Sequence, residues 1–141
     1  MFDKIVLPID LNHPASWEKA LPMALRLAGD NGEIHVLGIV HDIGAAMVAS
    51  FLPADFETKA LNHMETALED FIAENLPEGA KASPHVGHGH VPETILTSAR
   101  KIGADVIVMA SHPPDELRSF LVGSAAEKVV RHSEIPVLVV R

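Results

Sequence analysis

The sequence predicts a single-domain α/β protein, a doubly wound sheet of five parallel strands flanked by four helices over residues 1–141. Short apolar runs alternate with segments of helical periodicity in the order β-α-β-α-β-α-β-α-β. The run 104–111 is apolar apart from Asp105 and Ser111 near its ends, as in a strand covered on both faces, and right-handed crossovers then give a doubly wound sheet. A length of 141 residues with 48% hydrophobic content fits one compact domain.

The N-terminal elements are predicted from apolar runs and one helical face. Residues 4–10, KIVLPID, indicate a buried strand. A helix carrying Trp17 on its apolar face follows and ends near Gly29. Pro22 lies inside this helix and is expected to kink it, because proline cannot donate to the carbonyl four residues back. Residues 33–40 predict the second strand.

The middle of the chain contains two helices around a weaker strand. The connection 41–53 is rich in Gly, Ala and Met and has no clear period, whereas 54–76 has the pattern of a long amphipathic helix. Residues 81–89 predict a strand. In the next helix, Pro92 stands in the first turn, basic residues fill the last turn, and Gly103 ends it.

The C-terminal part predicts strand 104–111, a loop, a helix at about 124–132 and a closing strand, IPVLVV. The last strand is apolar and lacks a charged residue until Arg141. An exposed edge of this kind pairs readily with a second copy, so we expect a homodimer through residues 136–140. The alternative is that this strand lies inside the sheet and is covered.

Composition excludes several function classes. The formal net charge of -8 argues against nucleic acid or an anionic membrane surface as partner. The absence of cysteine excludes a disulfide framework, a cysteine zinc site and thiol catalysis. The N-terminal segment lacks the features of a signal peptide, and no apolar stretch reaches membrane-spanning length, so we expect a cytoplasmic protein without membrane insertion.

A doubly wound sheet places ligands beyond the carboxyl ends of its strands, where the strand order reverses. Asp10, at the end of the first strand, has the chemistry to accept hydrogen bonds from ribose hydroxyls. The alternative is a helix cap or a solvated loop carboxylate. The candidate positions at the strand ends are Pro8, Ile9, Asp10, Ile39, Val40, Met109, Ala110, Ser111 and His112.

Gly123 and Ser124 stand at the head of the last helix and have two readings. Ser124 and Glu127 have the spacing of a capping box, which satisfies helix amides without any ligand. A glycine at a helix start also lets the backbone approach a phosphate, and the helix supplies N–H groups and a positive dipole end. The two roles are compatible in one residue.

Histidines gather at His85, His88 and His90. No cysteine or second ligand group accompanies them, so we interpret them as surface histidines on a short strand and loop, and zinc binding is the alternative. No Ser-His-Asp or paired-carboxylate arrangement follows from the spacings, and no convincing general base is present, so we assign no catalytic residues.

These residues together resemble the universal stress protein family. The similarity covers essentially the whole chain and is strongest in KIVLPID, GHVPETIL and DVIVMASH…LVGSAAEKVVRHSEIPVLVV. The nucleotide-binding signature of that family reads Gly, two residues, Gly, nine residues, Gly, then Ser or Thr. Its positions fall here on Ala110, Pro113, Gly123 and Ser124, so half of it is present.

The resemblance implies a Rossmann-like fold of the adenine nucleotide alpha hydrolase-like type, a dimer through the final strand, and a site for ATP or another adenine nucleotide, with Mg²⁺. In this site Asp10 takes the ribose and main-chain groups around Ile39 meet the adenine. The 110–113 loop and Gly123-Ser124 hold the phosphates, and Ala125 and Ala126 add amides at the helix start.

The departures from the signature keep two functions open. Ala110 adds a methyl group, which is tolerated unless the backbone needs a positive φ. Pro113 has no N–H to offer a phosphate oxygen. One reading is a small dimeric ATP-binding regulator of the stress response that acts with a protein partner. The alternative is a nucleotide-free dimeric interaction module of the same family.

Overall fold

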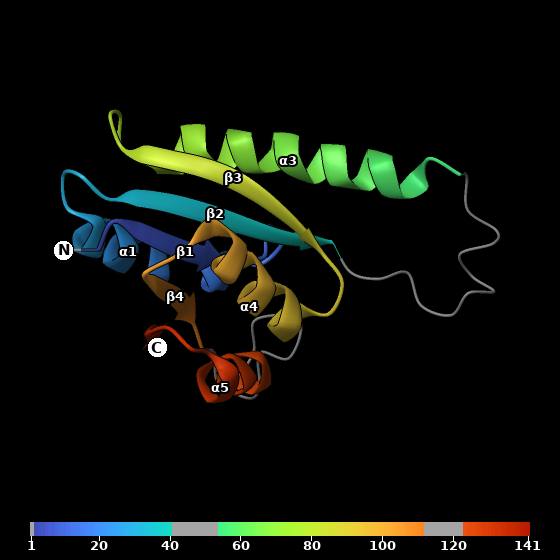
Figure 1. Cartoon of the computed structure of the whole chain (residues 1–141). Coiled ribbons are helices and arrows are strands. Elements are labelled where there is room, and N and C mark those ends of the chain that lie inside the picture. Colours follow the sequence, from blue (N-terminus) through green and yellow to red (C-terminus); the bar gives the residue numbers. More distant parts are fainter. Residues whose placement is uncertain (1, 41–53, 112–122) are drawn as a thin grey trace.

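A five-stranded sheet forms the middle layer of the computed structural model, which describes residues 2–40, 54–111 and 123–141 (Figure 1). The strand order is β3-β2-β1-β4-β5, and every neighbouring pair is parallel. The described elements are, in chain order, β1 (Lys4–Pro8), a 3₁₀ helix (Pro14–Ser16), α1 (Ala20–Ala28), β2 (Glu33–Val40), α3 (Phe56–Asn75), β3 (Lys81–His88), α4 (Val91–Ile102), β4 (Val106–Ala110), α5 (Gly123–His132) and β5 (Val137–Val140).

The sheet has a separate hydrophobic core on each face, because side chains alternate along each strand. In β1, Ile5 and Leu7 point to one face and meet apolar residues of α1 and α3. Val6 points to the other face, which α4 and α5 cover. In β4 every residue is buried, which matches its uninterrupted apolar sequence.

The predicted fold class is confirmed, with five parallel strands and four helices. Residues 33–40 form a strand with the predicted bounds, and the other strands begin or end within about two residues of expectation. In α4, Pro92 lies in the first turn and Gly103 adopts φ 74°, the left-handed conformation that glycine tolerates best. Local capping chemistry therefore fixes the position of this helix.

The prediction of a kink at Pro22 is wrong. The chain first forms the 3₁₀ helix, and α1 begins at Ala20, so Pro22 is the third residue of α1. In the first turn a missing N–H disturbs a helix least, because those amides lack partners within the helix. Trp17 precedes α1 and packs edge-on against Phe71 of α3, with ring centroids 5.0 Å apart.

Among the described residues, no helix has both the length and the apolar character needed to cross a membrane.

The packing of α4 against β3 depends on Gly87. A Cβ atom at this position would lie 2.4 Å from Cγ2 of Thr94, which is far inside van der Waals contact. We expect Gly87→Ala to lower the free energy of unfolding by about 1–3 kcal/mol through overpacking. Urea denaturation measures this loss.

The matched control combines Gly87→Ala with Thr94→Ser, because serine lacks the clashing methyl group. The double variant should recover part of the lost stability, so the two changes should be non-additive. Strict additivity would show that the clash is not the cause.

Candidate functional site

A cavity of about 440 Å³ opens at the carboxyl ends of β1 and β2. The β2 and β4 strands lie on opposite sides of β1, so this edge is where the strand order reverses and where a crevice forms. In Figure 1 the arrowheads of β2 and β3 point to this edge. The cavity is lined by Ile9, Asp10, Leu11, Asn12, Ile39, Val40, Ala60, His63, Met64, Ala67 and Val91.

The turn after β1 holds Asp10 in place through its main chain. The Asp10 N–H donates to Oγ of Ser16 at 2.8 Å, and the Ser16 hydroxyl donates back to the Asp10 carbonyl at 3.1 Å. Ser16 is fully buried, and the N–H of His13 also donates to the Asp10 carbonyl, at 2.9 Å. This ring of bonds fixes the point where the chain leaves the sheet.

The carboxylate of Asp10 braces the same turn. Its Oδ1 accepts the N–H of Asn12 at 3.0 Å, and its Oδ2 lies 2.9 Å from Nδ1 of His13. The residue is 6% exposed, so the interpretation as a solvated loop carboxylate is wrong, and the helix-cap alternative is replaced by this turn. The carboxylate is thereby fixed in orientation at the rim of the cavity.

The rest of the cavity is a mainly apolar slot between the end of β2 and α3. Ile39 and Val40 form one wall, and Ala60, Met64 and Ala67 of α3 form the other. Gly38 lets the two walls approach, because a Cβ there would lie 2.8 Å from the sulfur of Met64. An apolar slot that ends in a few fixed polar groups is the usual form of a site for a small organic ligand.

The residues predicted on β4 and α5 are placed differently from those on β1 and β2. Met109 and Ala110 are 0% and 2% exposed, so their side chains belong to the core. Ala125 and Ala126 are buried in the same core as Met109, and their contribution to a ligand would be main-chain only. The N–H of Ser111 donates to the carbonyl of Val140 at 2.9 Å and is thereby used within the sheet.

Of the predicted residues, the cavity brings together Ile9, Asp10, Ile39 and Val40. Pro8 ends β1 and is buried beside it. The α5 helix follows the carboxyl end of β4 in the chain, so its first residue, Gly123, lies at this same edge of the sheet. Outside the described residues lie His112, Pro113 and the connection 41–53. The side chain of Ser124 is not described either.

The sequence interpretation missed the α3 wall of the cavity. It also missed the two hydrogen bonds between Ser16 and the main chain of Asp10, which we call the Ser16 brace. Ala60, Met64 and Ala67 recur at spacings of three and four along one helical face, and two of them are small. This pattern is the signal that could have identified a helix face lining a cavity. Nothing in the local sequence of Ser16 marks it as a partner of Asp10.

His85 lines a groove at the surface but is only partly exposed. This side chain is half-buried, and its Nε2 lies 2.7 Å from Nδ1 of His35 on the neighbouring strand. His88 is exposed and lies 3.5 Å from a carboxylate oxygen of Glu57. Within the described ranges, no group of three or more His, Cys, Asp or Glu side chains has the arrangement of a metal site.

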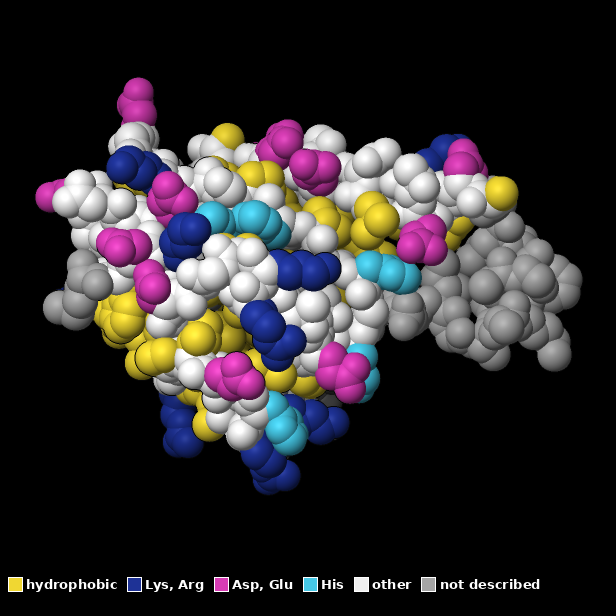
Figure 2. Space-filling model, viewed as in Figure 1, with side chains coloured by type: hydrophobic (Ala, Val, Ile, Leu, Met, Phe, Trp, Pro, Cys, Tyr) yellow, Lys and Arg dark blue, Asp and Glu magenta, His cyan; other side chains and the backbone are white. Residues whose placement is uncertain are grey.

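The surface around these elements carries mixed charge. Figure 2 shows acidic and basic side chains interspersed over the face that α4 covers. Apolar side chains gather in the same view near the C-terminal segment. Among the described strands, β5 has a neighbour on one side only, and its four apolar residues are all half-buried.

Comparison with known proteins gives one consistent result. Residues 1–141 match the model of the universal stress protein family. The chain is 32% identical to universal stress protein G of Escherichia coli O157:H7, over 144 aligned residues and the full length of both proteins.

Solved structures share the fold along the chain. Universal stress protein UspA from Lactobacillus plantarum aligns with a TM-score of 0.72 at 21% identity, covering 99% of this chain and 97% of that one. A universal stress protein in complex with cAMP aligns at 0.61 with 16% identity, covering 99% and 97%. A family protein from Arabidopsis thaliana with AMP bound aligns at 0.60 with 17% identity, covering 98% and 90%.

Removal of the Ser16 brace tests how the site is positioned. We expect Ser16→Ala to lower the free energy of unfolding by about 1–3 kcal/mol, because the buried N–H of Asp10 loses its acceptor. Thr66→Ala, on the exposed surface of α3, is the control and should stay within about 0.5 kcal/mol of the parent. Equal denaturation midpoints for the two variants would contradict this role.

Proposed function

The chain belongs to the universal stress protein family, and from this premise we propose that it binds an adenine nucleotide, ATP foremost, in the cavity at the carboxyl ends of β1 and β2. In this proposal the protein is a dimeric regulator of the stress response in the cytoplasm, and a protein partner recognises whether the nucleotide is bound. The observation that carries the proposal is the meeting of the buried Asp10 carboxylate with the apolar slot in one cavity.

The slot suits a purine base. It is lined by Ile39 and Val40 at the end of β2 and by Ala60, Met64 and Ala67 of α3, which offer apolar contact. The Asp10 carboxylate lies in the same cavity, and carboxylate oxygens accept hydrogen bonds from the hydroxyls of a ribose. AMP and cAMP, which the two solved relatives hold, share this base and sugar.

We assign the phosphates to the start of α5, at the carboxyl ends of the strands and on the β4 side of β1. The start of α5 supplies main-chain N–H groups and the positive end of the helix dipole, which favour an anion. Mg²⁺ would accompany the triphosphate, because the chain carries a formal net charge of -8. The residues at the two altered signature positions, Ala110 and Pro113, weaken this part of the site more than the base and ribose part.

One observation favours the alternative, a nucleotide-free interaction module. The Asp10 carboxylate already accepts the N–H of Asn12 and contacts His13, so the turn is held without a ligand. The cavity therefore needs no nucleotide for its own stability. The direct test is whether the purified protein carries, or takes up, an adenine nucleotide.

We also propose a homodimer through β5. All four residues of β5 are apolar and half-buried, and of the strands that the structure describes only β4 pairs with β5. The carbonyls of Pro136 and Val140 accept bonds from the β4 side. Because parallel strands alternate their bonding direction, Val137 and Val139 direct their N–H and C=O groups to the free edge, where a second copy can pair.

Filling the slot tests the nucleotide proposal. Freshly purified protein should release close to one adenine nucleotide per chain on denaturation, or bind Mg-ATP, AMP or cAMP in calorimetry. Ala67→Leu places a larger side chain in the cavity and should reduce the affinity by about tenfold or more.

The control is Ala73→Leu, the same change on an exposed position of α3, and it should leave the affinity unchanged. No nucleotide in the preparation and no binding heat from any of the three compounds would establish the interaction module instead. Equal loss in both variants would place the nucleotide elsewhere.

Blocking the free edge tests the dimer. Val139→Pro removes an outward N–H without removing a bond to β4, so we expect a monomer by analytical ultracentrifugation. Val139→Thr keeps the donor and the β-branched shape and should remain dimeric. A dimer that persists in a folded Val139→Pro variant would exclude strand addition at this position.

A further inference from the structure

Two imidazole rings face each other between β2 and the edge strand β3. Nδ1 of His35 lies 2.7 Å from Nε2 of His85, with the ring centroids 4.9 Å apart. His35 is 8% exposed and His85 is half-buried. Two neutral imidazoles can form this bond because one ring nitrogen donates and the other accepts, so the contact holds a single proton.

The neighbouring carboxylate determines which ring donates. Oε2 of Glu33 lies 3.4 Å from Nε2 of His35, and this buried nitrogen meets no hydrogen-bond geometry with any described residue. A carboxylate attracts an N–H and repels a lone pair at this distance. His35 therefore carries its proton on Nε2 and accepts the Nε2–H of His85 on Nδ1.

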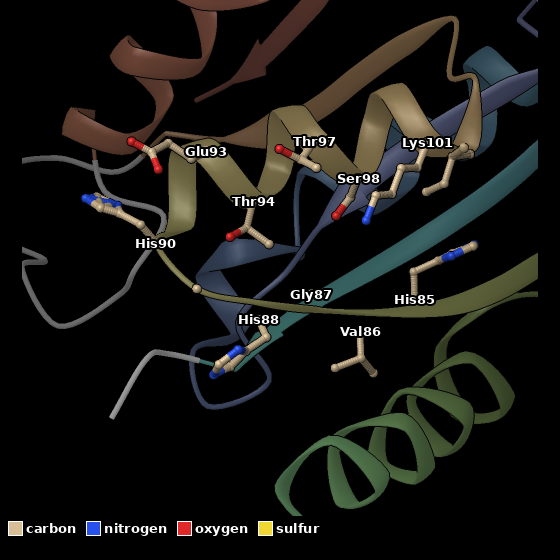
Figure 3. Close-up of a pocket in the computed structure, with 12 residues that line it drawn as sticks. His85, Val86, Gly87, His88, His90, Glu93, Thr94, Thr97, Ser98 and Lys101 are labelled. Atoms are coloured by element: carbon tan, nitrogen blue, oxygen red, sulfur yellow. The ribbon is translucent and has the colours of Figure 1, made fainter. Parts of the chain in front are cut away.

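The next proton must then go to Nδ1 of His85. This ring lines a groove of about 610 Å³ between β3 and α4. Figure 3 shows Ser98 and Lys101 pointing from α4 toward the face of β3 that carries His85, while Val86 projects from the opposite face. This added proton therefore reaches His85 from a groove that is also lined by Lys101.

The charges around the pair come from every neighbouring element. In the register of the sheet, Lys4 of β1 and Lys81 of β3 both lie opposite Glu33. The α4 helix contributes Lys101 at one end of the groove and Glu93 to its lining. Of these groups, Glu33 favours the charged form of His35 and Lys4 opposes it.

Burial has the largest effect on the pKa of both rings. Burial lowers the pKa of His35 below its ordinary value of 6.5, and Lys4 lowers it further, while Glu33 partly offsets both. Burial also lowers the pKa of His85, and the neighbouring His35 adds to this effect. The pair is therefore neutral at pH 7.

We propose that His35 and His85 form an acid-sensitive clasp that holds the edge strand β3 against β2. In the neutral pair one N–H joins the two facing nitrogens and closes the clasp. Uptake of two further protons opens it, because both facing nitrogens then carry an N–H and the two imidazolium rings at 2.7 Å repel each other. The strand then loosens next to the cavity, since the N–H of Gly89, just after β3, donates to the carbonyl of Val40 at 3.0 Å.

The direction of the pH dependence follows from the lowered pKa values. The unfolded chain protonates both histidines near pH 6.5, before the folded protein does. The stabilisation is therefore complete above pH 6.5 and is lost as the pH falls through 6.5 toward the folded pKa values. With two protons involved, the folding equilibrium constant changes by up to about a hundredfold per pH unit in this window.

Nuclear magnetic resonance of the wild-type protein tests the clasp directly. Histidine side-chain ¹⁵N spectra should show His35 protonated on Nε2 at pH 7, and both rings should titrate below pH 6.5. Hydrogen exchange, corrected for its intrinsic pH dependence, should show β3 amides losing protection between pH 6.5 and 5 while β1 and β4 amides keep theirs.

A variant pair adds a second measurement. His85→Leu removes one of the two titrating rings, so the proton uptake on unfolding at pH 6 should fall by up to one proton. His90→Gln removes an exposed histidine that lines the same groove and should leave β3 protection at low pH as in the wild type.

Titration of His85 at or above pH 6.5 would overturn the proposal, as would β3 protection that is unchanged down to pH 5. The wild-type measurements decide the matter even if His85→Leu does not fold.

Discussion

The pairing of β1 with β4 at the centre of the sheet is the constraint on which the rest of the structure depends. Both strands are buried on both faces, so helices must cover the sheet on each side. The chain winds outward from β1 in one direction to β2 and β3, and in the other to β4 and β5. The helices of the two halves therefore lie on opposite faces, and the carboxyl end of β1, where the strand order reverses, remains open.

This open end of the sheet explains why several hydrogen bonds fix the turn after β1. A loop that leaves a buried strand carries polar backbone groups that must find partners. Ser16 and the Asp10 carboxylate supply these partners within the turn itself. The same bonds place a buried carboxylate at the rim of the cavity, so a structural requirement and a candidate binding group coincide in one residue.

The two edges of the sheet are finished by different chemistry. β5 is short and apolar and leaves donors and acceptors available for a second chain. β3 contains Pro84, which has no N–H to offer a partner strand, and polar side chains that include His85. We infer that one edge favours association between copies, whereas the other discourages it and depends on side-chain contacts to stay in place.

The sequence by itself determined the order and type of the elements, the two core faces and the caps of α4. These features are local: periodicity, Pro92 and Gly103 act within a few residues of where they stand. It also placed Ile9, Asp10, Ile39 and Val40 together at the strand ends, where they line the cavity. The carboxyl ends of parallel strands meet at one end of the sheet, however the helices pack.

The tertiary structure alone decided the α3 wall of the cavity, the Ser16 brace and the pairing of His35 with His85, which are 50 residues apart. It also decided that α1 begins late enough to place Pro22 in the first turn. Strand register and helix packing set these contacts, and neither is encoded in the period of a single segment, because both depend on how distant segments fill the same space.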